Sequence, residues 1–232
     1  MTDRVLEALL AGNDNHTAAL PPDHFAAVQD GQEPDAVTVA CADSRVPQDG
    51  MWANDEPGWL FTPSTIGNQV LDRVDGETVI DGNVLYPLLN TGTEVAVVVG
   101  HTGCGAVTAA LEAAQGQPPD APPGLSKWIE LLVPIVAAGL EDDRVDPDRD
   151  PSLVDQLVEY NVDHQVAALR EADAVPDDVV VDGIVYDFQE VYGAVPGRTY
   201  LVNLDGETDP TAIREAVPDR FADHVVRLLD GD

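Results

Sequence analysis

The chain has 232 residues, of which 43 are acidic and 11 basic, and a formal net charge of −32. A surface this negative repels nucleic acids and anionic membranes, so neither is expected as a partner. Hydrophobic residues make up 44% of the chain, an ordinary share for a globular protein, so the charge indicates an acidic surface and not disorder.

The charge balance also predicts the environment. Lys127 is the only lysine, and concentrated salt screens the self-repulsion of so acidic a chain, which favours a halophilic source over an ordinary acidic bacterial protein.

The length suits one domain, so we expect residues 1–232 to form a single domain. No basic N-terminal segment precedes an apolar stretch, and the longest apolar run, at 131–140, contains a proline; we therefore expect a cytoplasmic protein.

Periodicity predicts helices and strands that alternate along the chain. Amphipathic or alanine-rich segments predict helices at 2–10, 24–28, 106–114, 125–140, 152–172 and 211–229. Short apolar runs predict strands at 36–40, 59–61, 94–100, 178–186 and 198–203, the last as a candidate edge strand. We therefore expect an α/β fold: a single domain with a mostly parallel sheet of four or five strands, flanked by helices.

Two of these strands run directly into candidate metal ligands. Cys41 follows the strand at 36–40, and His101 and Cys104 follow the strand at 94–100, on the turn before a helix. The carboxyl ends of parallel strands share one edge of a sheet, where open α/β folds place their chemistry. If the two strands are neighbours, two thiolates and one imidazole converge. That is the ligand set of a Zn²⁺ site that keeps a fourth position open.

Two alternatives compete with a zinc site. A cysteine after an apolar strand is, taken alone, more often a small core residue than a ligand. A redox pair is the other alternative, but the C-x-x-C motif is absent, and a redox pair needs neither His101 nor Asp43. Zinc is favoured because both cysteines stand beside polar turn residues and one has a histidine three positions away.

The motif C-A-D-S-R at 41–45, together with H-T-G-C-G at 101–105, resembles the paired signature of the β-class carbonic anhydrases. The likeness extends to segments 9–13, 161–165 and 183–187. The resemblance implies that Cys41, His101 and Cys104 hold one Zn²⁺ per chain and that Asp43 and Arg45 form the catalytic dyad. It implies reversible hydration of CO₂ to bicarbonate and a proton, in dimers or larger even-numbered assemblies whose substrate cleft lies at the dimer interface.

Physical chemistry gives the dyad a task. Zinc can lower the pKa of bound water to about 7, but two thiolates cancel much of the metal's charge, so neighbouring groups must help. Asp43 could accept the hydrogen bond of zinc-bound hydroxide, while Arg45 holds the carboxylate away from the metal. Without that pair Asp43 could become a fourth ligand, a closed state that the resemblance implies at lower pH. The alternative for segment 43–45 is an ordinary turn with a surface ion pair.

The candidate substrate site is less sharply defined. Gln32 and Tyr86 are similar to residues of the plant-like branch of the family, whose pocket also takes aromatic side chains from a neighbouring subunit. Phe61, Ile66 and Tyr86 would form an apolar wall that favours CO₂ over water, and Gly105 is a further candidate contact. Core packing is the alternative for the three apolar residues.

The chain also departs from the family pattern. The usual pattern has arginine and asparagine where this chain has Ser64 and Thr65. The bicarbonate-binding branch uses that arginine with a tryptophan, whose place is taken here by Thr38. We therefore predict that bound bicarbonate does not regulate this protein.

The sequence leaves two other functions open. The same zinc site could hydrolyse CS₂ or COS, which the resemblance also allows. A non-catalytic zinc-binding protein would instead have a closed Cys₂HisAsp shell with Asp43 as a permanent ligand. Arg45 argues against that shell, because it offers Asp43 another partner.

Overall fold

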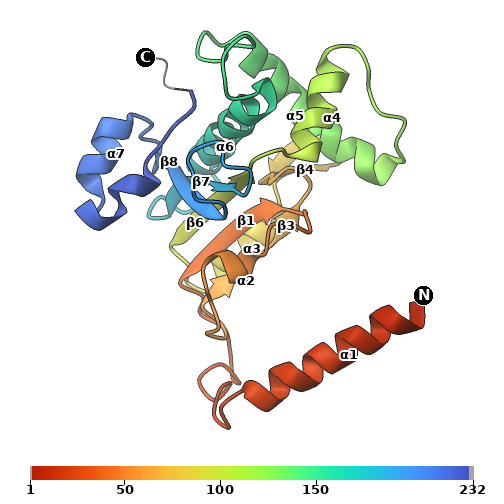
Figure 1. The fold of residues 1–232 in the computed structure, drawn as a ribbon, viewed down its shortest axis with the longest axis vertical. Coiled ribbons are helices and arrows are strands. Elements are labelled where there is room, and N and C mark those ends of the chain that lie inside the picture. The colour runs from red at the N-terminus through yellow and green to blue at the C-terminus, as the bar shows by residue number, and fades with distance from the viewer. Residues whose placement is uncertain (1, 230–232) are drawn as a thin grey trace.

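A computed structural model describes residues 2–229, and its centre is one twisted sheet (Figure 1). The strands run in the order β2-β1-β6-β7-β8, and the short β3 also pairs with β1. All neighbours are parallel except β7 and β8. The prediction of a mostly parallel sheet with an edge strand near the end is confirmed. The strands are β1 (Ala36–Cys41), β2 (Leu60–Phe61), β3 (Ser64–Thr65), β6 (Val95–His101), β7 (Val180–Asp187) and β8 (Arg198–Leu204).

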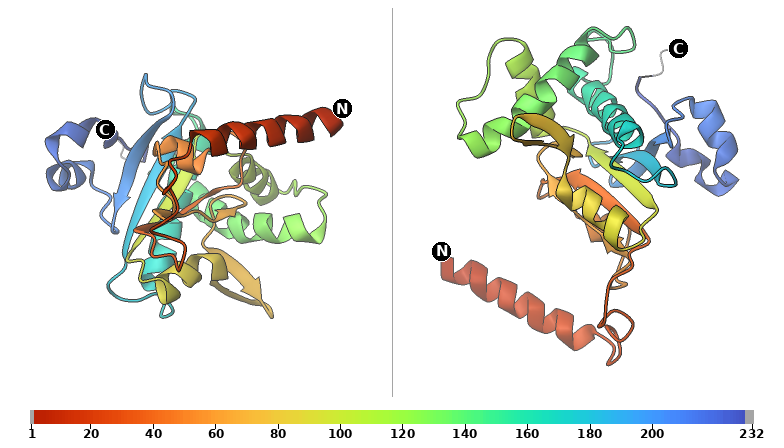
Figure 2. Two further views of the ribbon diagram at one scale, coloured as in Figure 1. Left: turned by 90° about the horizontal axis from the view of Figure 1, so that it is seen from below. Right: turned by 180° about the vertical axis from the view of Figure 1, so that it is seen from behind.

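Helices cover one face of this sheet (Figure 2). They are α3 (Gly82–Asn90), α4 (Gly105–Ala114), α5 (Pro123–Leu140) and α6 (Leu153–Glu171). The α6 helix comes closest, because a Cβ added at Gly100 or Gly183 would lie 2.6 or 2.7 Å from a methyl group of Val162. Glycine on β6 and β7 thus lets the helix pack directly on the strands that carry His101. The helix α5 is long and apolar enough to cross a membrane, but its buried side, which includes Leu132 and Ile135, belongs to this core, and core helices of soluble proteins pass the same test.

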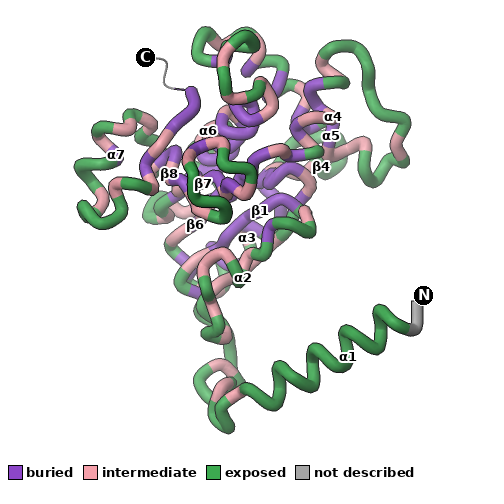
Figure 3. Tube along the Cα trace, viewed as in Figure 1, coloured by how far each residue is buried: buried purple, intermediate pink, exposed green. Residues whose placement is uncertain are grey.

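The opposite face of the sheet is only partly covered. A small cluster of Ala40, Val46 and Val99 packs under Met51 and Trp52, beside the short helix α2 (Gln48–Met51). Farther along this face the apolar residues are only half-buried, the class that Figure 3 colours pink. They are Val97, Ile184, Tyr186 and Leu201. One chain therefore leaves apolar surface on this side.

The N-terminal helix differs from its prediction. It runs over Thr2–Ala19 as α1, so Gly12 does not end it, and it stands away from the rest of the molecule (Figure 1). Every side chain from 4 to 19 is exposed, including Leu6 and Leu9, which are 59% and 66% exposed. A helix without neighbours meets no packing constraint at Gly12, and the propensity cost of one glycine is only about 1 kcal/mol.

Other segments also differ from the predictions. Residues 24–28 form turns and not a helix. The predicted helical end at 211–229 consists of α7 (Pro210–Ala216), the 3₁₀ helix η1 (Asp219–His224) and a non-helical stretch at 225–229. The α3 helix was missed because Pro87 lies inside it, although the Asp81 side chain caps its start. The hairpin of β4 (Leu71–Val74) and β5 (Glu77–Ile80) was also missed, although Asp75-Gly76, both at positive φ, is a typical two-residue hairpin turn.

Candidate metal centre

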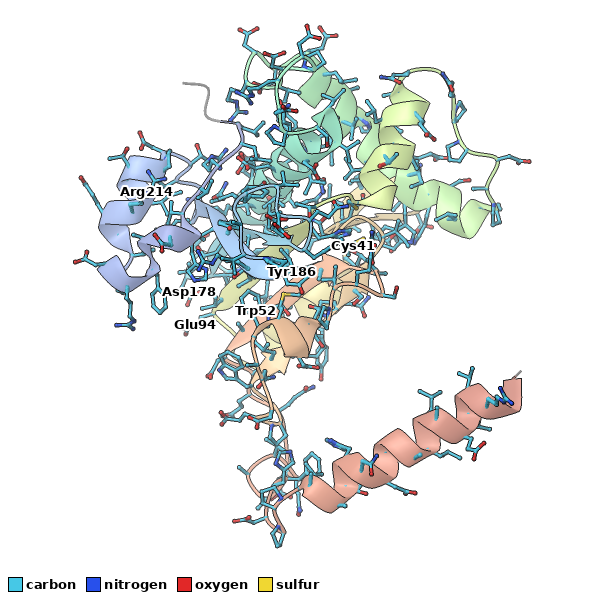
Figure 4. All side chains as sticks on the ribbon, viewed as in Figure 1. Cys41, Trp52, Glu94, Asp178, Tyr186 and Arg214 are labelled. Atoms are coloured by element: carbon cyan, nitrogen blue, oxygen red, sulfur yellow. The ribbon has the colours of Figure 1, made fainter. Side chains whose placement is uncertain are left out.

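Three candidate ligands converge at the carboxyl edge of the sheet. The register pairs Ala40 with Val99, so the ends of β1 and β6 lie side by side. The ligand atoms of Cys41, His101 and Cys104 all lie within 4.8 Å of one another, and the two sulfurs are 3.9 Å apart. All three side chains are buried. Figure 4 labels Cys41 at the end of β1.

The local chain explains how His101 and Cys104 face one point. The strand β6 ends at His101, and Gly103, at φ +62°, turns the chain back towards the sheet. Cys104 then occupies the N-cap of α4, where the amide dipoles of the helix favour a thiolate. A strand, a two-residue turn and a helix start thus place an imidazole and a sulfur on the same side.

The imidazole of His101 is held in the form that a metal needs. Its Nδ1 lies 3.0 Å from the carbonyl oxygen of Thr102, which can only accept a hydrogen bond, so Nδ1 carries the proton. The lone pair is therefore on Nε2. That atom is buried and has no hydrogen-bond partner within the described residues 2–229. A buried lone pair without a donor is typical of a metal ligand.

The two neighbouring thiols shift each other's pKa in opposite directions. A hydrogen bond with the Cys104 thiol lowers the pKa of Cys41, and the amide N–H of Gly67, 3.4 Å from the Cys41 sulfur, adds to this effect. The same pairing, together with burial, raises the pKa of Cys104 well above its usual value. A cation between the sulfurs would favour loss of the second proton. Two soft sulfurs and one imidazole suit Zn²⁺ with one position open, so these residues fit that metal.

Asp43 and Arg45 form a close pair beside these ligands. The guanidinium donates to both carboxylate oxygens, at 2.9 and 2.7 Å, and the backbone N–H of Arg45 also donates to Oδ1 at 2.9 Å. These hydrogen bonds hold the pKa of Asp43 well below its usual range, so it is ionised at neutral pH. Its Oδ2 lies 3.7 Å from Nε2 of His101. The carboxylate thus sits next to the ligand atoms while both of its oxygens are engaged by Arg45.

Phe188 is a neighbour of this site that no sequence motif indicated. Its ring stacks on the imidazole of His101, with centroids 5.8 Å apart, and the guanidinium carbon of Arg45 lies 4.7 Å from its centroid. It therefore packs against both a candidate ligand and the dyad. It follows the end of β7, the strand next to β6, and its position just past a strand end is the only signal that sequence offered.

Two buried acids, also missed, hold the turn between His101 and Cys104. The hydroxyl of Thr102 donates to Asp187 at 3.3 Å, and the amide of Gly103 donates to Asp155 at 2.8 Å. Both acids come from segments more than fifty residues later in the chain, so no local pattern connects them to the motif.

The predicted substrate residues fall into two groups. Ile66 precedes Gly67, the amide donor to Cys41, and Gly105 begins α4, so both lie at the metal edge. Phe61 pairs with Val37, four residues before Cys41, which places its backbone about 13 Å from the metal edge at roughly 3.3 Å per residue. The ring of Tyr86 lies 6.0 Å from that of Phe61.

Gln32 lies at the same remote end of the sheet as Phe61 and Tyr86. It lines a surface hollow with Pro34, Asn90 and Glu94, residues that flank the starts of β1 and β6. Within one chain, therefore, Gln32, Phe61 and Tyr86 are not brought to the metal ligands.

The two positions that depart from the bicarbonate-binding pattern are joined by one side chain. The hydroxyl of Thr38 donates to Oε1 of Gln48 at 2.8 Å, and Nε2 of Gln48 donates to the hydroxyl of Ser64 at 3.0 Å. The same Nε2 lies 3.2 Å from the carbonyl oxygens of Thr62 and Pro63. Where that branch has a tryptophan and an arginine, this chain has a satisfied network of neutral groups.

Comparison with known proteins points to one family. Residues 36–194 match the sequence profile described as carbonic anhydrase. The chain is 28% identical to carbonic anhydrase 2 of Mycobacterium tuberculosis over 202 aligned residues, and this aligned region covers 84% of this chain and 90% of the relative. It is 30% identical over 146 residues to a carbonic anhydrase of Pseudomonas aeruginosa, or 63% of each chain.

Solved structures agree on the fold. A β-carbonic anhydrase of Aspergillus fumigatus superimposes with a TM-score of 0.69 at 23% identity, over 95% of this chain and 99% of that one. A tetrameric β-carbonic anhydrase of Sordaria macrospora gives 0.67 at 20% identity, over 86% and 97%. The profile spans more than half of the chain and contains all three candidate ligands. The chain therefore belongs to the β-carbonic anhydrase family.

Proposed function

We propose that this protein is a zinc-dependent lyase that hydrates CO₂ reversibly to bicarbonate and a proton, the reaction of its family. One observation carries the proposal. A buried Cys₂His cluster lies beside the carboxylate of Asp43, and both oxygens of this carboxylate accept hydrogen bonds from the guanidinium of Arg45. A purely structural zinc site would need a fourth protein ligand, whereas here the fourth candidate, Asp43, is already paired.

The residues of the chain have separate tasks. Zinc, when bound by Cys41, His101 and Cys104, supplies a Lewis acid that makes water nucleophilic near neutral pH. Asp43 accepts a hydrogen bond from the attacking water and fixes its orientation; its low pKa means that it does not keep the proton, which leaves to solvent buffer. Arg45 keeps this carboxylate ionised and in place.

The direct test is a stopped-flow assay of CO₂ hydration combined with metal analysis, at low and at molar salt. We expect about one zinc per chain and a rate that disappears with the metal. A zinc-free protein, or a zinc-loaded one without hydration activity, would contradict the proposal. Running CS₂ and COS as competing substrates in the same assay distinguishes the alternative hydrolase.

The closed, non-catalytic site is the other alternative. In the structure both oxygens of Asp43 accept hydrogen bonds from Arg45, which favours an open fourth position. X-ray absorption of the zinc protein above and below neutral pH distinguishes the two arrangements. A Cys₂HisAsp shell that persists at high pH would favour the non-catalytic protein.

We also propose that the protein is a homo-oligomer. The helix α1 is exposed on all sides and carries an apolar stripe of Val5, Leu6, Leu9 and Leu10, while one sheet face keeps half-buried apolar residues. Exposed apolar surfaces of this kind are usually covered by a partner, and a second copy of the chain could cover both the apolar stripe of α1 and the sheet face. A second copy could also bring Gln32, Phe61 and Tyr86 to the metal edge, as in the plant-like branch. Sedimentation of the full chain against a chain lacking residues 2–19 tests this; an unchanged mass would contradict it.

Regulation by bicarbonate is not expected. The Thr38–Gln48–Ser64 network presents no cationic group that could bind the anion. We therefore propose that activity follows ordinary product inhibition by bicarbonate. A cooperative loss of activity with added bicarbonate would contradict this.

The acidic surface supports a saline cytoplasm as the working environment, with residues 1–232 acting as one domain. A net charge of −32 makes self-repulsion a large destabilising contribution at low salt. We expect the thermal midpoint to rise steeply as KCl increases from millimolar to molar concentrations. A midpoint that does not depend on salt would argue against a halophilic source.

A further inference from the structure

Asp155 is a buried acid to which the proposed reaction assigns no task. It lies in the first turn of α6, its residue is 6% exposed, and its Oδ1 accepts the hydrogen bond from the amide of Gly103 at 2.8 Å. Its Oδ2 accepts a hydrogen bond from the hydroxyl of Ser152 at 2.6 Å. Both carboxylate oxygens are therefore committed, one of them to the turn between His101 and Cys104.

The position of Gly103 makes this contact consequential. Its carbonyl oxygen accepts from the guanidinium of Arg45 at 3.4 Å, while its amide donates to Asp155. The peptide groups on both sides of Gly103 are thus tied, one to the dyad and one to α6. A displacement of this turn would move Cys104, which follows directly, and would remove one contact of Arg45.

Helix capping alone does not explain the geometry. Ser152 is the N-cap of α6, and an acid three residues later usually returns to the backbone N–H of the cap residue. Here the side chain of Asp155 instead reaches a different segment, fifty-two positions earlier in the chain. A charge-assisted hydrogen bond in a buried setting is strong, so it restrains the turn even without metal.

We propose that Asp155 is a positioning residue of the metal centre. Its carboxylate holds the amide of Gly103 and so keeps His101 and Cys104 in ligating positions and Arg45 against the turn. The inference rests on the proposed zinc site but not on the identity of the substrate. Zinc retention therefore tests it separately from CO₂ hydration.

The experiment compares zinc release from wild type, Asp155→Ala, Asp155→Asn and a matched control, Asp81→Ala. Asp81 is also a buried acid, 4% exposed, that accepts a backbone amide at a helix start, but its partner Asn83 belongs to α3. Release is followed with a chromophoric chelator, and the folded fraction of each variant is measured by circular dichroism. Removal of an outer-shell partner typically costs 10- to 100-fold in metal affinity or activity.

We expect Asp155→Ala to release zinc roughly 10- to 100-fold faster than wild type, because nothing restrains the turn. Asp155→Asn keeps an oxygen for the Gly103 amide and should lie between the two. Asp81→Ala should lose thermal stability but release zinc at the wild-type rate. Equal zinc release rates for folded wild type and folded Asp155→Ala would overturn the proposal. So would an increase in the release rate of Asp81→Ala as large as that of Asp155→Ala.

Hydrogen exchange decides the matter if Asp155→Ala does not fold. In wild-type protein stripped of zinc, the amide of Gly103 should exchange as slowly as the buried amides of α6. Exchange at the rate of an exposed loop amide would show that Asp155 does not hold the turn, and the proposal would fall. If wild type binds zinc but does not hydrate CO₂, the proposed function fails while this inference stands.

Discussion

The two ends of the central sheet differ in how much one chain completes by itself. At the carboxyl end, Cys41, His101 and Cys104 are buried and lie within 4.8 Å of one another. At the amino end, Gln32 is exposed on a loop and Tyr86 is 47% exposed on α3. Among the residues that Figure 4 labels, Cys41 lies at the carboxyl end and Glu94 at the amino end. The comparison teaches that one chain brings the three metal ligands together by itself, whereas in our proposal the predicted substrate pocket is completed by a second copy.

The largest effect should come from the carboxyl end. We expect Cys41→Ser to abolish zinc retention and to lower the hydration rate by at least about 1000-fold, because a hydroxyl is a poor replacement for a thiolate ligand. Metal analysis and stopped-flow kinetics on the same sample measure both quantities. Full activity without metal would refute the assignment of this end of the sheet.

Asp43→Asn should separate chemistry from metal binding at the same end. The amide keeps the size of the side chain but cannot accept from Arg45 with two charged oxygens, so the attacking water loses its fixed acceptor. We expect zinc content to remain at the wild-type level and kcat to fall about 100-fold. An unchanged rate across neutral pH would remove Asp43 from the mechanism.

Arg45→Gln should change the pH dependence of activity. Arg45 lowers the pKa of Asp43, so in the variant that pKa rises towards its usual value near 4. The carboxylate is still ionised at neutral pH but is free to bind the metal. We expect about tenfold lower activity at pH 7, with recovery as pH rises because hydroxide competes better for the metal. Rate profiles between pH 6 and 9 measure this; a parallel loss at every pH would contradict it.

The amino end should show smaller effects that depend on assembly. We expect Gln32→Ala to raise KM or lower kcat by about tenfold or less, since it removes one polar contact. Mixing Gln32→Ala chains with Cys41→Ser chains, with subunit exchange, should give more activity than the average of the two parents. In a hybrid, the intact Cys41 of one copy meets the intact Gln32 of the other. Activity equal to the parental average would show that the two ends do not share a site.

The smallest effect is expected at Phe188. Its ring faces the guanidinium of Arg45 at 4.7 Å, and a cation–π contact at a partly exposed site contributes about 0.5–1 kcal/mol. Phe188→Leu should therefore lower kcat about two- to fivefold, while Phe188→Tyr, which keeps the ring, should stay close to wild type. Steady-state kinetics of both variants make the comparison, and equal losses in the two would exclude a role for the ring face.

Local pattern was sufficient for much of the fold. The β-branched run that became β6 and the alanine-rich segment that became α4 were both predicted, because each carries its own period and its own end signals. The candidate ligands could be found because they follow directly after such strands. The C-terminal end of α1 and the existence of α3 were not predicted, because Gly12 and Pro87 are helix breakers that this structure tolerates.

The sequence by itself determined the ligand types, the dyad motif and the acidic surface, because each is a property of residues close together along the chain. Only the tertiary structure decided which distant side chains support them: Phe188 against Arg45, Asp155 on the Gly103 amide, and Gln48 between Thr38 and Ser64. It also decided that Gln32 and Tyr86 lie away from the metal edge. The physical reason is that periodicity reports which face of an element is buried, whereas strand register and helix packing fix which residues meet across the core.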